Sequence, residues 1–163
     1  MKILFLHLSD AHLTQETNLS EINTNAIVNS LSQMGNFDEC VLVFSGDIAN
    51  SGNENEYKVA GRMFGRIIKG IIDKYFDGNK HIQTLIVPGN HDNLVGNPDR
   101  KREEIIGFYK DKKTESHYYD DLVELDNFFD FANRNYCFSR NKNIEIRSLR
   151  FGSFMIKVNL INS

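Results

Sequence analysis

Apolar and polar residues follow two kinds of pattern in the amino-terminal part of the chain. Three short runs rich in Leu, Ile, Val and Phe predict buried strands at residues 2–8, 39–44 and 82–87. Between them, apolar residues recur at helical spacing, which predicts helices at residues 20–34 and 54–75. The connections are long enough for parallel crossovers. The pattern therefore predicts an α/β fold, with a mainly parallel sheet and flanking helices.

The first predicted helix has recognisable end signals. Ser20 can serve as its N-cap, and Gly35-Asn36 supplies its stop. Asp77-Gly78-Asn79 ends the second helix in the same way.

The sequence changes character after Asp92. A polar stretch follows that contains the basic cluster Arg100-Lys101-Arg102, and residues 120–133 have the apolar spacing of an amphipathic helix. Ile144 to Leu149 and Phe154 to Ile161 are predicted to form a C-terminal β-hairpin. One face of the last strand is wholly apolar. Unless the helix at residues 120–133 folds back and covers it, we expect that face to lie open and the chain to self-associate through it.

Composition narrows the range of functions. The 163 residues suit one domain, and the net charge of -3 gives no general drive towards nucleic acid or an anionic membrane. The 2 cysteines have no CxxC partner and are expected to be reduced structural thiols. The apolar run at the start is too short for a signal peptide or a membrane span. We therefore expect a cytoplasmic protein with no membrane partner.

Each of the three predicted strands ends in polar residues with the chemistry of metal ligands. The three clusters are Ser9-Asp10-Ala11-His12, Ser45-Gly46-Asp47 and Pro88-Gly89-Asn90-His91-Asp92. The carboxyl ends of parallel strands meet at one edge of a sheet, so the clusters are expected to converge there. Carboxylate, imidazole and amide groups together suit a first-row transition metal.

Taken one at a time, these clusters also fit simpler interpretations. Asp10 and His12 on their own fit a loop cap and a surface histidine, and Asp47 fits a turn aspartate that accepts backbone hydrogen bonds. The third cluster is more specific, because Pro-Gly punctuation, strand context and residue types coincide.

Together the three strand ends resemble the calcineurin-like metallophosphoesterase superfamily. The family motifs Asp-x-His, Gly-Asp and Gly-Asn-His-Asp stand here as Asp10-Ala11-His12, Gly46-Asp47 and Gly89-Asn90-His91-Asp92. The order, the strand context and the spacing all agree. The resemblance implies the first half of a four-layer αββα sandwich.

The resemblance also implies a metal-dependent phosphoesterase with two divalent ions, of manganese, iron or zinc. Asp10 and His12 would hold one ion, Asp47 would bridge, and Asn90 would hold the second. A metal-bridging hydroxide would attack the phosphorus atom of a phosphodiester. His91 would be catalytic, protonating the leaving oxygen or stabilising its charge.

The residues around Gly46-Asp47 indicate which branch of the superfamily the chain resembles. Protein phosphatases carry an Asp and an Arg where this chain has Asn50 and Ser51, which argues against that class. The bacterial cyclic-nucleotide phosphodiesterase-like branch is resembled by the stretch from Gly46 to Gly52 with Glu56-Tyr57 after it. This resemblance implies a phosphoester substrate, such as a cyclic nucleotide. The opening His7-Leu8-Ser9-Asp10 is also similar to the DNA-repair exonuclease branch, so a nuclease acting on nucleic acid stays open.

The chain departs from the family towards its C-terminus. No histidine follows His117, so the family's lone His and its Gly-His-x-His motif are absent. We therefore expect residues 1–163 to be a metallophosphoesterase domain truncated before those motifs, with an incomplete metal site. The rival interpretation is a non-catalytic half-domain that acts in assembly or partner binding.

Overall fold

The computed structural model describes residues 1–19, 23–78, 80–92, 94, 125–136 and 144–161. Its centre is a parallel sheet in the order β1-β2-β3. The strands are β1 (Ile3–Leu8), β2 (Glu39–Ser45) and β3 (Gln83–Val87). The predicted α/β fold and its parallel sheet are confirmed.

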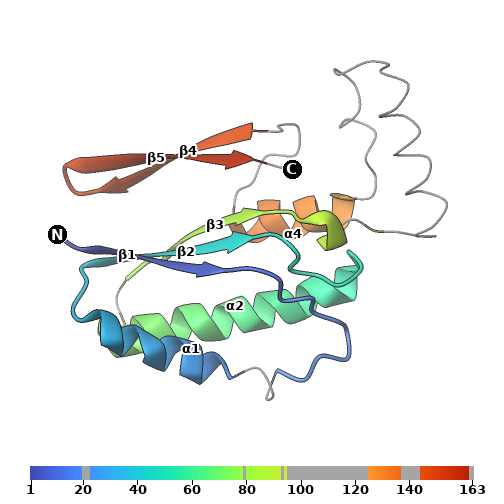
Figure 1. The fold of residues 1–163 in the computed structure, drawn as a ribbon, viewed down its shortest axis with the longest axis horizontal. Coiled ribbons are helices and arrows are strands. Elements are labelled where there is room, and N and C mark those ends of the chain that lie inside the picture. Colours follow the sequence, from blue (N-terminus) through green and yellow to red (C-terminus); the bar gives the residue numbers. More distant parts are fainter. Residues whose placement is uncertain (20–22, 79, 93, 95–124, 137–143, 162–163) are drawn as a thin grey trace.

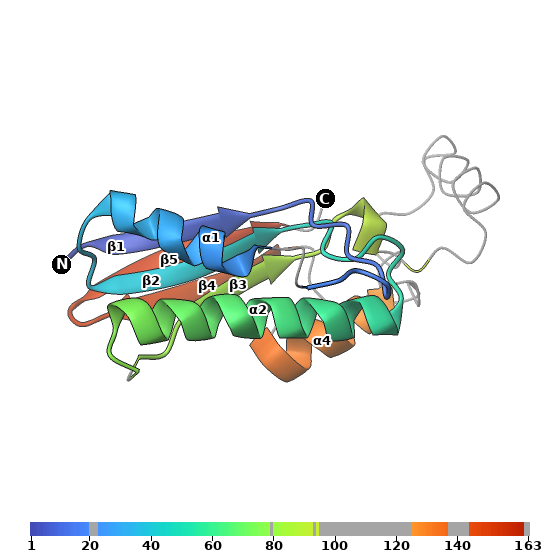
Figure 2. The same ribbon diagram turned by 90° about the horizontal axis from the view of Figure 1, so that it is seen from below.

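Two helical segments cover one face of this sheet (Figure 1). They are α1 (Thr24–Ser30), which continues into the 3₁₀-helix η1 (Leu31–Met34), and α2 (Glu54–Tyr75). Figure 2 shows both helices in front of the strands when the molecule is seen from below. The second helix has the bounds that the sequence predicts.

The first helix begins later than its predicted N-cap. Asn23 is the N-cap, and its Oδ1 accepts a hydrogen bond of 2.8 Å from the backbone N–H of Ala26. Ser20 lies outside the described residues. The predicted stop is confirmed, because Gly35 follows η1 with φ 70°, a left-handed conformation that favours glycine.

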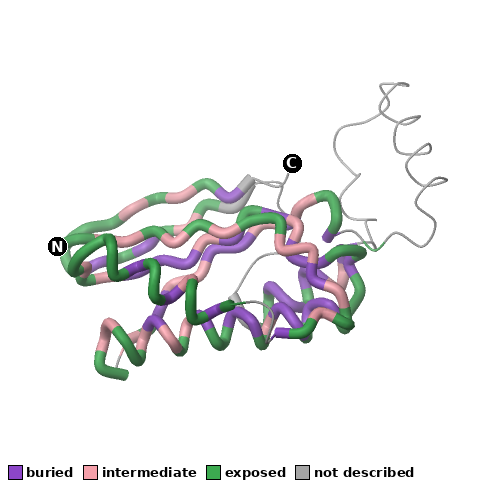
Figure 3. Tube along the Cα trace, turned by 60° about the horizontal axis from the view of Figure 1, so that its bottom comes forward, coloured by how far each residue is buried: buried purple, intermediate pink, exposed green. Residues whose placement is uncertain are grey.

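The main core lies between β2 and the helices. Val41 and Leu42 are fully buried, and the ring of Phe44 lies 5.2 Å from that of Phe64 on α2. Figure 3 shows that buried positions concentrate on the central strand and on the inner side of α2. A central strand covered on both faces explains the continuous apolar run in its sequence.

The prediction that β1 is a buried strand is wrong. Phe5 is 44% exposed, and His7 is exposed, with its Nε2 2.6 Å from the Ser45 hydroxyl. In the described part of the chain, β1 pairs with β2 alone. Side chains alternate along a strand, so Phe5 and His7 share one face of β1, and it is this face that is exposed.

The hairpin forms a second layer on the sheet face opposite the helices (Figure 1). Its antiparallel strands are β4 (Ile144–Phe151) and β5 (Phe154–Ile161), and β5 contacts β3. The hairpin therefore adds an apolar layer to the core.

The expected open apolar face on the last strand is wrong for most of its length. Leu160 is 6% exposed, because the hairpin turns this face towards the parallel sheet, and Ile156 and Val158 also pack against the core. Phe154 and Met155 remain exposed beside the hairpin turn, at 61% and 55%. Self-association through these strands stays a prediction.

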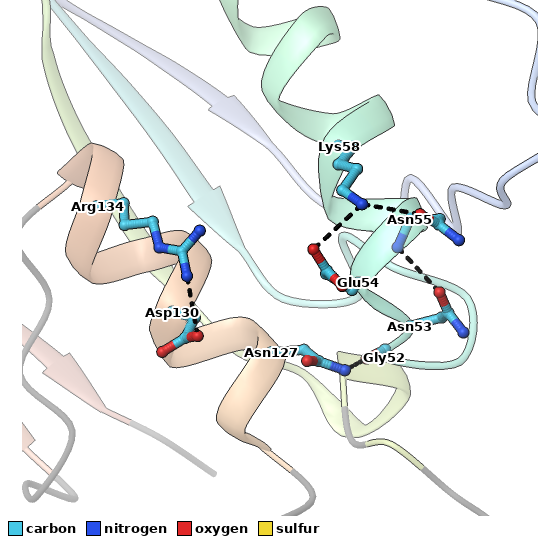
Figure 4. A network of polar contacts seen from close by, with 8 residues as sticks. All are labelled: Gly52, Asn53, Glu54, Asn55, Lys58, Asn127, Asp130 and Arg134. Atoms are coloured by element: carbon cyan, nitrogen blue, oxygen red, sulfur yellow. Dashed lines mark hydrogen bonds and ion pairs between the residues drawn. The ribbon is translucent and has the colours of Figure 1, made fainter.

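Helix α4 (Asp126–Tyr136) packs beside α2 and β3. Phe131 stacks on Tyr57 with ring centroids 5.3 Å apart. Asn127 donates a hydrogen bond of 2.9 Å from Nδ2 to the carbonyl oxygen of Gly52, in the loop before α2 (Figure 4). The start of the predicted helix 120–133 lies outside the described residues, as does the basic cluster at residues 100–102.

Two further expectations concern the thiols and the membrane. Cys40 is a buried free thiol, and burial raises its pKa to about 11. Cys137 lies outside the described residues. None of the described helices has the length and apolar character needed to cross a membrane.

Candidate metal centre

The loops that follow β1 and β2 run side by side. The backbone N–H of Asp10 donates to the carbonyl of Gly46 at 3.2 Å, and that of His12 donates to the carbonyl of Asp47 at 3.0 Å. The first and second sequence clusters therefore meet at the carboxyl edge of the sheet, as parallel pairing of β1 with β2 requires.

Three residues of these loops have left-handed backbone conformations. The φ angles are 54° at Asp10, 42° at His12 and 53° at Asp47. A left-handed backbone is uncommon for a residue with a side chain, although Asp and His adopt it more often than other types. Residues held in sparsely populated conformations cluster at functional sites. The occurrence of three such residues at one edge of the sheet therefore supports a functional site there.

The third cluster approaches the second through two glycines. A Cβ built on Gly46 would lie 3.0 Å from the Cα of Gly89, and Gly46 has φ 103°. A Cβ built on Gly89 would collide with the carboxylate of Asp47. These two backbone segments are in contact with no side chain between them, which explains why glycine precedes both Asp47 and Asn90.

The resulting cluster brings together His12, Asp47 and His91. One ligand atom from each lies within 4.8 Å of the other two, a spacing at which they could hold one metal ion. The rings of His12 and His91 are nearly perpendicular, with centroids 4.5 Å apart. Imidazole nitrogens with a carboxylate oxygen make a donor set that fits divalent manganese, iron or zinc.

The side chain of Asp47 is oriented by the turn after β3. Its Oδ1 accepts a hydrogen bond of 2.8 Å from the backbone N–H of His91. The carboxylate is half-buried, and one of its oxygens lies within 4.8 Å of a ring nitrogen of His12 and of His91. A carboxylate with one oxygen held and the other available is suited to ligation.

The imidazole of His91 is oriented by a backbone group. Its Nδ1 lies 3.0 Å from the carbonyl oxygen of Asn50, which can only accept, so Nδ1 carries the proton. That contact assigns Nε2 as the nitrogen that presents a lone pair, or a second proton when the ring is charged. A backbone carbonyl partner of this kind is typical of histidines in metal sites.

Asp92 is the buried acid of the centre. It is fully buried in the 3₁₀-turn η2 (Asn90–Asp92), and its carboxylate accepts from the backbone N–H groups of Ile48, Ala49 and Gly89. The Tyr57 hydroxyl on α2 donates to the same carboxylate at 3.0 Å. Burial raises the pKa of Asp92, and these hydrogen bonds oppose the rise. Burial, and then the charge of Asp92, raise the pKa of Tyr57 above its ordinary value.

The remaining two predicted ligands lie at the same edge but outside this group of three. Asp10 is exposed and does not join the His, Cys, Asp and Glu side chains whose ligand atoms converge among the described residues. Asn90 is exposed and begins η2, directly after the Gly89 contact. The assignment of Asp10, His12, Asp47 and Asn90 as ligands therefore stays a prediction.

A second buried acid shapes the loop between Asp47 and α2. Glu56 accepts hydrogen bonds of 3.0 Å from the backbone N–H and hydroxyl of Ser51 and from the backbone N–H of Asn53. It completes a capping box with Asn53 at the start of α2. This arrangement holds the segment that carries the Asn50 carbonyl.

A pocket of about 280 Å³ lies beside this loop. It is lined by Thr14, Gln15, Glu16, Ser51, Asn53 and Glu56. In the sequence, its lining residues begin two positions after His12 on one side and directly after Asn50 on the other.

Sequence reasoning gave no role to several of these groups. From the sequence alone, Asp92 is identified only as the last residue of its motif, and Tyr57 only as part of the Glu56-Tyr57 pair. The capping-box spacing of Asn53 and Glu56 would have identified the second buried acid. Nothing in the sequence indicates that the carbonyl of Asn50 orients His91, because any residue at that position has a carbonyl.

The model of the calcineurin-like phosphoesterase family matches residues 3–154, which is most of the chain. The chain belongs to this family. The resemblance deduced from the three motifs is thus confirmed, and the α/β architecture agrees with it. Comparison with curated proteins gave no significant match.

Membership of the family gives the centre a chemical context. The family acts on phosphoesters and usually binds divalent metals, and the group of His12, Asp47 and His91 fits such a metal. The chain therefore belongs to a family of metal-dependent phosphoesterases and has a candidate metal centre at the carboxyl edge of its sheet.

Proposed function

We propose that this protein hydrolyses phosphodiesters with two divalent metal ions, and that Asp10, His12, Asp47 and Asn90 supply part of the ligand set, which is incomplete in this chain. The observation that carries the proposal is the convergence of donor atoms from His12, Asp47 and His91 within 4.8 Å. These residues come from loops after three successive parallel strands, where α/β folds place their ligands.

The donor set suits manganese, iron or zinc. The backbone N–H of His91 holds one oxygen of Asp47, and a carboxylate has a second oxygen, so Asp47 would be the shared ligand. His12 offers an imidazole nitrogen, and Asp10 and Asn90 add a carboxylate and an amide oxygen from exposed positions. Mixed nitrogen and oxygen donors favour these metals over calcium.

Divalent ions held at this position would polarise the phosphoryl group and activate water for in-line attack. The protein supplies the proton for the leaving group. With Nδ1 of His91 held by the carbonyl of Asn50, a charged ring presents its second proton at Nε2. His91 then protonates the leaving oxygen, and the fixed ring orientation lowers the entropic cost of that transfer.

The substrate we favour is a phosphodiester of nucleotide size, with a cyclic nucleotide as the first candidate. Asn50 and Ser51 occupy the positions where protein phosphatases carry Asp and Arg. The 280 Å³ pocket beside the loop has room for part of such a substrate, and its hydroxyl, amide and carboxylate groups suit a hydroxylated sugar. The buried free thiol of Cys40 is consistent with a cytoplasmic protein.

The test combines metal uptake with hydrolysis. The purified chain is titrated with Mn²⁺, and cleavage of bis(p-nitrophenyl) phosphate and of a cyclic nucleotide is followed. We expect metal-dependent cleavage that Asp47→Asn removes, because the shared ligand loses its charge. Asp73→Asn makes the same chemical change at an exposed position of α2 and should have no effect. A chain that takes up no metal, or cleavage that survives Asp47→Asn, would contradict the proposal.

A further inference from the structure

The carboxylate of Asp92 connects two backbone segments that carry the candidate ligands. Its Oδ1 accepts from the N–H of Ala49 at 2.9 Å, and its Oδ2 accepts from the N–H groups of Gly89 at 2.8 Å and Ile48 at 3.3 Å. We propose that Asp92 is a positioning residue that sets the affinity of the centre for a divalent metal ion, because it holds the backbone beside Asp47 and Asn90. This inference rests on the proposed function.

The positions of the three donors support this role. Ile48 directly follows Asp47, and Gly89 directly precedes Asn90. Asp92 itself directly follows His91. The carboxylate thus holds the backbone next to each candidate ligand after β2 and β3.

The close packing of these segments makes the ligand geometry sensitive to the carboxylate. Gly46 and Gly89 are in backbone contact, and the N–H of His91 donates to Asp47 at 2.8 Å. With no side chain between the segments, a shift of one relative to the other directly changes the distance between Asp47 and His91. Residues that support metal ligands without contacting the metal themselves keep those ligands in position.

Burial of Asp92 is costly, and the surroundings compensate for it. An ionised carboxylate without partners is strongly disfavoured in a protein interior. Here three backbone N–H groups and the Tyr57 hydroxyl all point at it, and Tyr57 also donates to the Asp92 carbonyl at 3.1 Å. Tyr57 therefore anchors the carboxylate to α2, the longest described helix.

The experiment measures Mn²⁺ affinity by electron paramagnetic resonance, at a temperature where each variant is folded. Asp92→Asn replaces an acceptor oxygen by an NH₂ group that cannot accept from backbone N–H groups. We expect affinity to fall about 10–100-fold, the range for outer partners of metal ligands. Tyr57→Phe keeps the Asp92 carboxylate and should lower Mn²⁺ affinity by a smaller factor. It replaces Asp92→Asn in the experiment if that variant does not fold.

Tyr75→Phe is the matched control. It removes the same hydroxyl from the same helix, where Tyr75 donates to the carbonyl of Val28 at 3.0 Å, far along α2 from the centre. It should leave Mn²⁺ affinity unchanged. Wild-type affinity in folded Asp92→Asn, or equal losses in Tyr57→Phe and Tyr75→Phe, would overturn the proposal.

Amide hydrogen exchange separates this inference from the proposed function. In Asp92→Asn, or in Tyr57→Phe if that is the folded variant, the amides of Ala49 and Gly89 should exchange faster without metal. Unchanged exchange there overturns the positioning role even if the wild type binds Mn²⁺ well. A wild type that binds no Mn²⁺ refutes the proposed function, and with it the proposed effect of Asp92 on metal affinity. Faster amide exchange in the variant would still support the role of Asp92 in connecting the two backbone segments.

Discussion

The Nδ1 of His91 donates a hydrogen bond of 3.0 Å to the backbone carbonyl of Asn50. The two residues are 41 positions apart in sequence, on the loops after β3 and β2. Because the acceptor is a backbone group, the orientation of the imidazole depends on the path of the loop and not on the asparagine side chain.

This relationship predicts different results for substitutions at the two positions. Asn50→Ala keeps the carbonyl and should retain near wild-type turnover. His91→Ala should slow turnover by about 100- to 10,000-fold, the range for general acid catalysis, while metal content stays nearly intact. Turnover with a phosphodiester and metal content by mass spectrometry check both. Metal loss in His91→Ala equal to that in Asp47→Asn would instead identify His91 as a ligand.

The contact between the glycines predicts that Gly89 tolerates no side chain. Gly89→Ala would drive a Cβ into the Asp47 carboxylate, so we expect a loss of about 1–3 kcal/mol of unfolding free energy, as for overpacking elsewhere, together with weaker metal binding. Gly65→Ala is the control, because nothing lies within 4 Å of its Cβ and it is exposed within α2. It should gain about 0.5–1 kcal/mol. Urea denaturation compares the two, and equal changes would contradict the contact.

The docking of the hairpin predicts a stability difference between its two faces. Leu160 is buried against the sheet, so Leu160→Ala should lower the unfolding free energy by about 2–5 kcal/mol. Ile146 is 64% exposed on the outer face, and Ile146→Ala should change stability by no more than about 0.5 kcal/mol. Thermal denaturation provides the measurement. Similar small effects at both positions would show that the hairpin does not pack on the sheet in solution.

Because Cys40 is buried, we expect its thiol to be protected from reagents and to make the unfolding free energy depend on pH in the alkaline range. Its pKa is raised from 9.0 to about 11, so the folded state keeps a proton that the unfolded state loses. The unfolding free energy should therefore fall as pH rises from 9.0 to about 11. Cys40→Val should lack this contribution. In a Cys137→Ser background, the thiol should react with a chromogenic disulfide reagent only after unfolding, and rapid reaction of the native protein would refute its burial.

The sequence by itself determined the alternation of strands and helices and the edge where the chemistry lies. Local periodicity specifies each element, and the bounds of α2 and β5 follow from it directly. Parallel strands bring their carboxyl ends together, so the meeting of Asp10, Asp47 and Asn90 at one edge required no knowledge of side-chain contacts. The family followed from the residue types at these three ends.

Only the tertiary structure decided how the centre is supported. The nitrogen that His91 presents depends on the Asn50 carbonyl, and the role of Asp92 depends on amides 43 and 44 positions away. The exposure of His7 and the burial of Leu160 depend on where the hairpin lies on the sheet. Periodicity along a chain reports which face of an element is apolar. It does not report which distant segment covers that face, because that is set by packing between elements.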